Sequence, residues 1–205
     1  MCTTLSFFFF LSLQPRAGRS SHHDRISFTC EYTMAPFSKE NYRPSRKAGR
    51  KGDTEVETLL SKTFQESVMC DLYARSEVTI CIQILQSDGG NTMAAINAGT
   101  LALIDAGIAM KDYVVACTAA NLDGTAVCDA NQPEANAQGA ELMVALLPKS
   151  GQVVSTQMSS RIHVDHFEPL LALAQQGCRT IYDQMHAKVI ERTTGLAGAR
   201  LGQGQ

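Results

Sequence analysis

The stretch that decides the fold is residues 83–109, QILQSDGGNTMAAINAGTLALIDAGIA. A strand is predicted to end here in a double glycine, which opens a helix built almost wholly from small residues. Helix N-termini attract anions through unpaired N–H groups and the helix dipole, and glycines let a ligand's oxygens approach the backbone. The turn at Gly89, Gly90, Asn91 and Thr92 thus has the shape of a phosphate or nucleotide site, although it contains no Lys or Arg.

Outward from this stretch, the apolar periodicity predicts an α+β or α/β layer fold. The small residues of the central helix require tight packing against a sheet or another helix, and the apolar run at 113–119 suits a strand buried on both faces. The expected elements, in chain order, are a strand at 27–34, a helix at 53–73, a strand at 77–85, a helix at 92–105, a strand at 113–119, a hairpin turn at 122–125, strands at 141–148 and 152–158, and a helix at 165–192.

The two ends of the chain lie outside this pattern. Residues 1–26 combine the apolar run LSFFFFLSL with a polar stretch without periodicity, so we expect a disordered or non-native leader. The run resembles the core of a signal peptide, but no positive charge precedes it, and secretion is the weaker alternative. Residues 193–205, rich in Gly and Ala, are expected to form a flexible tail, which leaves one domain at 27–192.

Charge is divided unevenly along the chain. Residues 1–52 hold nine of the 18 basic residues and three of the 20 acidic ones, so this segment carries +6 and the remainder −8. A basic arm ahead of an acidic body suggests a polyanion as partner, and a solvated charged face is the alternative.

Seven cysteines are widely spaced and mostly lie in apolar runs. We expect them to be reduced, small core residues of an intracellular protein. His163 and His166 could lie one helical turn apart, as metal ligands do, but no other His/Cys cluster completes a site, so no metal is expected.

Residues 86–115, QSDGGNTMAAINAGTLALIDAGIAMKDYVV, resemble the signature of the RNase PH family. They are most similar to the RNA exosome ring subunit that is the counterpart of the archaeal exosome's catalytic subunit. Asp123-Gly124, followed by Asp129, is similar to the family's next strand pair. Over residues 27–192 the resemblance implies an RNase PH-like (ribosomal protein S5 domain 2-like) two-layer β/α fold that lacks its first strands.

Active members of that family are phosphorolytic 3′→5′ exoribonucleases, in which an Arg after the double glycine holds phosphate and two Asp residues six positions apart serve the chemistry. By this resemblance Thr92 stands at the Arg position, Asp129 at the first Asp and Ala135 at the second. An Arg fork binds phosphate bidentately, as a Thr hydroxyl cannot. Losing one such contact costs about 10²–10³ in rate. We therefore expect an inactive member with Asp129 as a vestige, no cofactor, and inorganic phosphate only if the chain is active.

The resemblance further implies a place in the six-membered ring of RNase PH-like exosome subunits, with S1/KH cap subunits and RNA as partners and no membrane. That ring supports 3′→5′ RNA processing and degradation, including rRNA maturation and mRNA turnover, in the nucleus, nucleolus and cytoplasm. A basic loop would face the RNA path by sequence-independent phosphate contacts. Its residues are Arg43, Arg46, Lys47, Arg50 and Lys51.

Two alternatives stay open. The first is an active phosphate-dependent 3′→5′ exoribonuclease. The second is a truncated product without stable function, because a sheet that lacks its first strands keeps an exposed edge and an uncovered core face.

Overall fold

A computed structural model of the chain describes residues 7–14, 27–38, 49–73, 76–122, 124–137 and 139–202. Helices and strands are mixed along the chain, which confirms the α+β class. In chain order the elements are β1 (Phe7–Gln14), β2 (Ser27–Met34), α1 (Gly49–Ser67), a 3₁₀ helix (Cys70–Tyr73), β3 (Glu77–Ile84), α2 (Asn91–Asp105), β4 (Val115–Leu122), β5 (Thr125–Cys128), α3 (Gln132–Asn136), β6 (Ala140–Leu147), β7 (Gln152–Met158) and α4 (Val164–Gly202).

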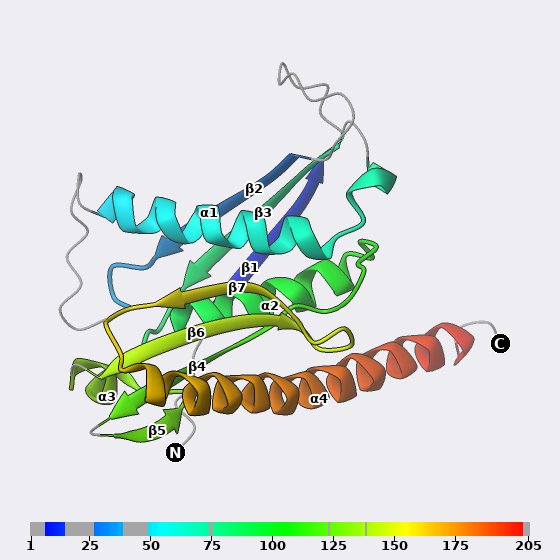
Figure 1. The fold of residues 1–205 in the computed structure, drawn as a ribbon. Coiled ribbons are helices and arrows are strands. Elements are labelled where there is room, and N and C mark those ends of the chain that lie inside the picture. Colours follow the sequence, from blue (N-terminus) through cyan, green and yellow to red (C-terminus); the bar gives the residue numbers. More distant parts are fainter. Residues whose placement is uncertain are drawn as a thin grey trace.

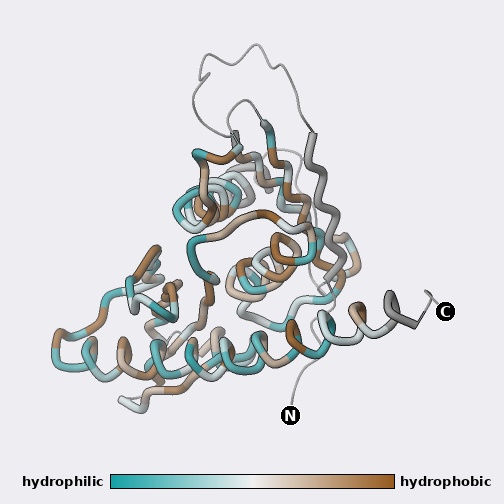
Figure 2. Tube along the Cα trace, turned by 90° about the vertical axis from the view of Figure 1, so that its right-hand side faces the viewer, coloured by the Kyte–Doolittle hydropathy of each residue, from teal (hydrophilic) through white to brown (hydrophobic). Residues whose placement is uncertain are grey.

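The strands form two sheets. The first has the order β1-β3-β2, in which β1 is antiparallel and β2 parallel to β3. The second is antiparallel and has the order β5-β4-β6-β7. Helices α1 and α2 lie between the two sheets, and α4 covers the other face of the second sheet (Figure 1). Figure 2 looks along α1 and α2 and shows them side by side above the long α4.

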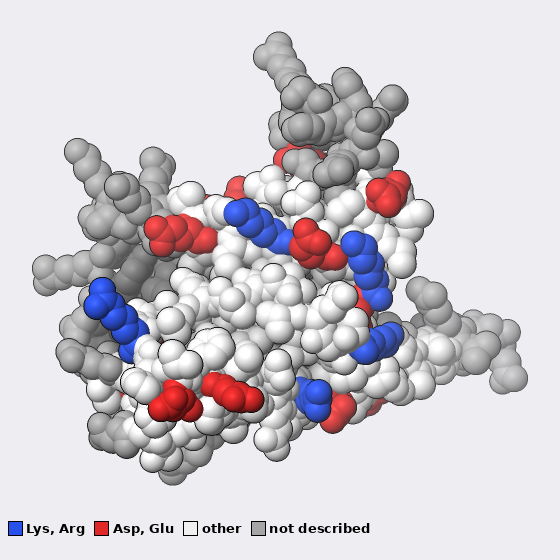
Figure 3. Space-filling view, viewed as in Figure 1, with Lys and Arg blue, Asp and Glu red and all other residues white. Residues whose placement is uncertain are grey.

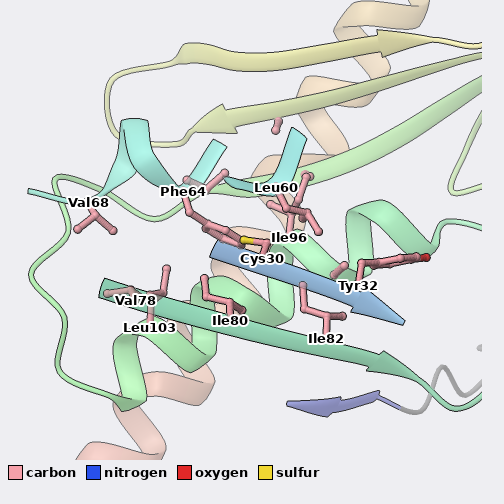
Figure 4. Packing of buried hydrophobic residues seen from close by; sticks show 14 of the residues in the cluster. Cys30, Tyr32, Leu60, Phe64, Val68, Val78, Ile80, Ile82, Ile96 and Leu103 are labelled. Carbon is pink, nitrogen blue, oxygen red and sulfur yellow. The ribbon is translucent and has the colours of Figure 1, made fainter. Parts of the chain in front are cut away.

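The main core fills the space around α1 and α2. On β3 the residues at positions 78, 80, 82 and 84 are buried, as the alternation in the sequence predicts. Figure 4 shows Val78, Ile80 and Ile82 gathered with side chains of β2, α1 and α2. The fully buried side chains of the cluster include Leu60, Phe64, Val68, Val78, Ile80, Ile82, Ile84, Ile96 and Leu103.

Helix α2 is hydrogen-bonded to β4 through side chains. Asn97 Nδ2 donates to the carbonyl of Ala116 at 2.9 Å, and Asn97 Oδ1 accepts from the Ala116 N–H at 2.8 Å. Thr100 Oγ1 donates to the carbonyl of Val114, the residue just before β4, at 2.8 Å. Residues 115–120 of β4 are all buried, between α2 on one face and α4 on the other, so the prediction of a strand buried on both faces is confirmed.

Part of the segment that we expected to be a disordered leader is ordered. Residues 7–14 form β1, which pairs with β3 along its whole length, from Phe7 opposite Ile84 to Gln14 opposite Glu77. Phenylalanine has a high strand propensity, and β3 offered an unpaired edge. The exposed edge that we expected on this side of β3 is therefore covered.

Both long helices differ from their expected bounds. Helix α1 begins at Gly49 rather than near residue 53, and no proline separates these residues from the predicted helix. It ends at Ser67, because Val68 pairs with Met110 in a β-bridge and the Met69 N–H donates to the carbonyl of Ala109.

Helix α4 continues to Gly202 through the segment that we expected to be a flexible tail (Figure 1). At the start of this segment, the hydroxyls of Thr193 and Thr194 donate to backbone carbonyls of the preceding helical turn. No proline interrupts the segment. Among the helices of the described residues, none combines the length and apolar character that a membrane crossing requires.

Candidate functional site

The double-glycine turn connects β3 to the N-terminus of α2. Gly89 has φ +101° and Gly90 φ +58°, values that residues with a side chain rarely adopt. Gly90 is the N-cap of α2 and provides no side-chain cap, so the first N–H groups of the helix are not satisfied by a capping side chain. The double glycine opens the helix as the sequence predicted, and anion binding by the turn stays a prediction.

Asn91 lies at the first position of α2, and only one of the two polar atoms of its side chain has a hydrogen-bond partner among the described residues. Its Nδ2 donates to Ser87 Oγ at 2.7 Å, which ties the helix start to the chain just before the double glycine. Its Oδ1 is buried and has no hydrogen-bond partner among the described residues. An orphaned buried oxygen costs free energy, so a donor from a ligand or water would be favoured there.

The segment around Asp129 packs directly against the turn. A Cβ on Gly90 would lie 3.4 Å from Asp129 Oδ1, and a Cβ on Gly89 would lie 2.9 Å from the carbonyl oxygen of Ala130. Asp129 itself has φ +57°, the one positive value among non-glycine residues of the described chain. The structure thus brings together the two motifs that the sequence singled out, and Gly89 permits their close approach.

No second free carboxylate accompanies Asp129 on α3. Ala135, the residue at the second Asp position by the resemblance, is on this helix. Its neighbour Glu134 forms a capping box with Asn131: Glu134 Oε2 accepts from the Asn131 N–H at 2.9 Å, and Asn131 Oδ1 accepts from the Glu134 N–H at 3.1 Å. The Glu134 carboxylate is thereby engaged in holding the helix start.

A pocket of about 270 Å³ opens at the start of α2. Gly90, Asn91 and Thr92 form part of its wall, so three of the four predicted turn residues line it. Among the described residues that line it, none is Lys or Arg. The others are Tyr32, Met93, Glu141, Met143, Gln157 and Ser159.

A second wall of the pocket, formed by β6, β7 and the residue after β7, was not indicated by the sequence patterns. Burial raises the pKa of the Glu141 carboxyl above its ordinary value. The Glu141 N–H donates to Ser159 Oγ at 3.2 Å, and the Ser159 N–H donates to the Glu141 carbonyl at 3.0 Å. A negative group here opposes a phosphate ion rather than attracting it. The one available signal was the acidic residue at the start of an otherwise apolar strand.

The predicted RNA-binding loop is not tested by the structure. Arg43, Arg46 and Lys47 lie outside the described residues, and Arg50 and Lys51 fall on the first turn of α1, where only the backbone is described. On the face shown in Figure 3, the described basic and acidic side chains are interspersed and do not gather into a basic patch.

The two histidines lie close together at the start of α4. Their ring centroids are 6.3 Å apart, and His163 Nδ1 lies 3.2 Å from Asp165 Oδ2 at an exposed position. The described residues contain no group of three or more His, Cys, Asp or Glu side chains arranged to hold a metal ion.

Two family profiles match most of the chain, in consecutive segments. The 3′ exoribonuclease family, domain 1, matches residues 13–109, and domain 2 of the same family matches residues 112–177. The chain belongs to the 3′ exoribonuclease (RNase PH) family. The junction between the two matches falls between α2 and β4, and the glycine turn of domain 1 meets Asp129 of domain 2.

Curated members of the family are similar over most of this chain. Exosome complex component RRP41 of Homo sapiens is 42% identical over 179 residues, which are 87% of this chain and 72% of the human protein. RRP41 of Mus musculus is 42% identical over 78% of this chain, and the match spans 64% of the mouse protein. Rrp41 of Thermococcus kodakarensis is 32% identical over 85% of this chain and 69% of its own length.

Superposition on two solved structures agrees with the RNase PH-like fold. Rice Rrp46 superposes with a TM-score of 0.75 at 17% identity, over 90% of this chain and 83% of its own. A chain of the Archaeoglobus fulgidus exosome with RNA bound to the active site superposes with a TM-score of 0.73 at 17% identity, over 88% and 79%.

Proposed function

We propose that this chain is a non-catalytic subunit of the RNA exosome core ring. Its relatives at 42% identity are named exosome complex components, and similarity at that level commonly extends to the surfaces by which a subunit is assembled. The role consists of holding the ring together and lining the path along which RNA is threaded during 3′→5′ processing and degradation.

The proposal that the chain is non-catalytic rests on the residues that line the pocket at the start of α2. The helix N-terminus and the glycine turn are present, but the described wall offers Thr92 and Glu141 where a phosphate site needs a cation. A helix N-terminus contributes about 0.3–1 kcal/mol toward an anion, less than a charge-assisted bidentate pair. Phosphate would be held too weakly to act as nucleophile.

The partners of this role are the other RNase PH-like subunits of a six-membered ring, S1/KH cap subunits and RNA. RNA contact falls to the basic residues at positions 43–51, since sequence-independent binding needs only phosphate neutralisation. The proposal includes residence in the nucleus, nucleolus and cytoplasm, where rRNA maturation and mRNA turnover take place.

Purification from the native cells tests assembly. The chain is tagged at its C-terminus, isolated gently and weighed by native mass spectrometry. Recovery with five other RNase PH-like subunits supports the ring role. Recovery only as a monomer or aggregate contradicts it and favours the alternative of a truncated product without stable function.

A second candidate function is phosphorolysis, and one observation favours it: Asp129 still lies against the double-glycine turn. The assembled ring, with its hydrolytic nucleases removed, is incubated with a short RNA in the presence and absence of inorganic phosphate. Phosphate-dependent release of nucleoside diphosphates that disappears in Asp129→Asn would establish an active enzyme. Equal, background release under both conditions supports the non-catalytic role.

A further inference from the structure

Three cysteines gather where β4 and β5 pack against α4. Cys117 on β4 and Cys178 on α4 are buried, and Cys128 at the end of β5 is half-buried. The sulfurs of Cys117 and Cys128 are 3.4 Å apart, and both cysteines are free thiols. They lie on one face of the sheet, because Cys128 stands opposite Ala119 and Cys117 is two residues away along the same strand.

A glycine on α4 leaves the space that this thiol pair occupies. A Cβ on Gly177 would lie 2.6 Å from Cys117 Sγ and 2.9 Å from Cys128 Sγ. Any other residue at this position would push the sulfurs aside. The helix therefore holds the two thiols against each other rather than separating them.

We propose that Cys117 and Cys128 are an oxidisable pair that forms a reversible intrachain disulfide with hydrogen peroxide as oxidant. The thiolate of Cys128, the more accessible of the two, attacks one peroxide oxygen and becomes a sulfenic acid as hydroxide leaves. The sulfur of Cys117 then attacks the sulfenic sulfur, the S–S bond forms, and water departs with the thiol proton. Both thiols are oxidised by two electrons in total, and one peroxide is reduced to two waters.

The neighbouring groups select this pairing. Cys178 is fully buried and donates its thiol proton to the carbonyl of Val144, and burial raises its pKa to about 12. Burial also raises the pKa of Cys117 far above its ordinary value, so this thiol does not react first with the oxidant. A sulfenic acid held 3.4 Å away is the electrophile within its reach.

The disulfide would restrict the backbone at the candidate site, whether or not the chain assembles into a ring. Asp129 follows Cys128 directly, and its N–H donates to the carbonyl of Thr118, the residue after Cys117, at 2.9 Å. A bond between the two sulfurs would close a ring around this hydrogen bond. Oxidation would then restrict the backbone that presents the Asp129 carboxylate to the glycine turn.

Peptide mapping tests the pairing. The full-length chain is treated with hydrogen peroxide, blocked with an alkylating agent under denaturing conditions and cleaved on the N-terminal side of aspartate. Cleavage before Asp112, Asp123 and Asp129 places Cys117 and Cys128 on separate peptides, 112–122 and 123–128, which only a disulfide can join. We expect the two peptides as one linked species, which a thiol reductant separates.

Two cysteine variants and the peptides recovered from the wild-type chain test the proposed pairing. Cys117→Ser should abolish the linked species and leave Cys128 over-oxidised, while Cys70→Ser, at a partly buried thiol remote in sequence, should leave the link intact. Recovery of both wild-type peptides alkylated, linkage of either one to Cys178, or linkage between two chains would overturn the inference. The wild-type result stands on its own if a variant does not fold.

Discussion

Phe64 of α1 occupies the space that a side chain at Gly99 of α2 would need. A Cβ on Gly99 would lie 2.4 Å from Cζ of the Phe64 ring; Phe64 is fully buried, and Gly99 is buried as well. The missing side chain at Gly99 thus leaves room for an aromatic ring of the neighbouring helix, which lets the two helices pack close together between the sheets.

Gly99→Ala should destabilise the fold, because the methyl group cannot enter without displacing Phe64. Overpacking of this kind costs about 1–3 kcal/mol in the free energy of unfolding, measured by urea denaturation. Gly195→Ala on α4 is the matched control, since nothing lies within 4 Å of its added Cβ. That variant should gain up to about 1 kcal/mol from helix propensity. Equal effects of the two substitutions would refute the packing argument.

Gly89→Ala should separate the glycine turn from the Asp129 segment. The substitution carries two costs, a strained φ of +101° and a contact of 2.9 Å with the carbonyl oxygen of Ala130. Gly124→Ala carries only the first, because φ is +84° and its surroundings are open. The strain alone costs about 1–2 kcal/mol. Unfolding midpoints should therefore fall further for Gly89→Ala, and a loss equal to that of Gly124→Ala would show that the close approach is unimportant.

Glu141→Gln should have a pH-dependent effect on stability. Burial raises the folded-state pKa of Glu141 above the ordinary value of 4.5, so the folded chain binds this proton more tightly than the unfolded chain. The stabilisation that protonated Glu141 contributes is therefore fully present below pH 4.5. It is lost as the pH rises through the folded-state pKa. The variant should gain relative to wild type at pH 7 and not at pH 4, as urea midpoints will report. Glu66→Gln, on the exposed face of α1, is the control.

Thr92→Arg should restore phosphate binding to the pocket. A hydrogen bond to a charged group contributes about 1.5–3 kcal/mol, so the affinity for inorganic phosphate should rise roughly tenfold or more. The measurement is the phosphate-dependent increase in Tm, compared with Thr125→Arg at an exposed position of β5. An identical response of both variants would mean that the turn does not present its N–H groups to the anion.

Charge reversal of Arg46, Lys47 and Arg50 to Glu should weaken RNA binding by the assembled ring. Each lost phosphate contact reduces the salt dependence of binding, so the slope of log K against log salt should fall by about one per contact. Reversal of Lys188 and Arg192 on the exposed face of α4 is the control. Binding that is unchanged across the salt titration would remove the basic loop from the RNA path.

Local patterns located most of the helices and strands and the glycine turn of the candidate site. Alternation located β2 and β3, the apolar run located β4, and the double glycine located the start of α2. The leader was predicted wrongly as disordered over residues 7–14, because a strand's pairing depends on a free edge elsewhere, which periodicity does not report. The end of α1 was placed too late, since its bridge to Met110 is long-range.

The sequence by itself determined the double-glycine turn at the start of α2, because backbone conformation and helix polarity are encoded within a few residues, while the RNase PH-like fold and the candidate Asp129 were implied by the resemblance of residues 86–115 to a known family. Only the tertiary structure decided that Asp129 lies against Gly90, that Glu141 forms part of the same pocket, and that Cys117 meets Cys128. Those relationships arise from strand pairing and from the packing of α4, and they join residues whose separation along the chain carries no local signal.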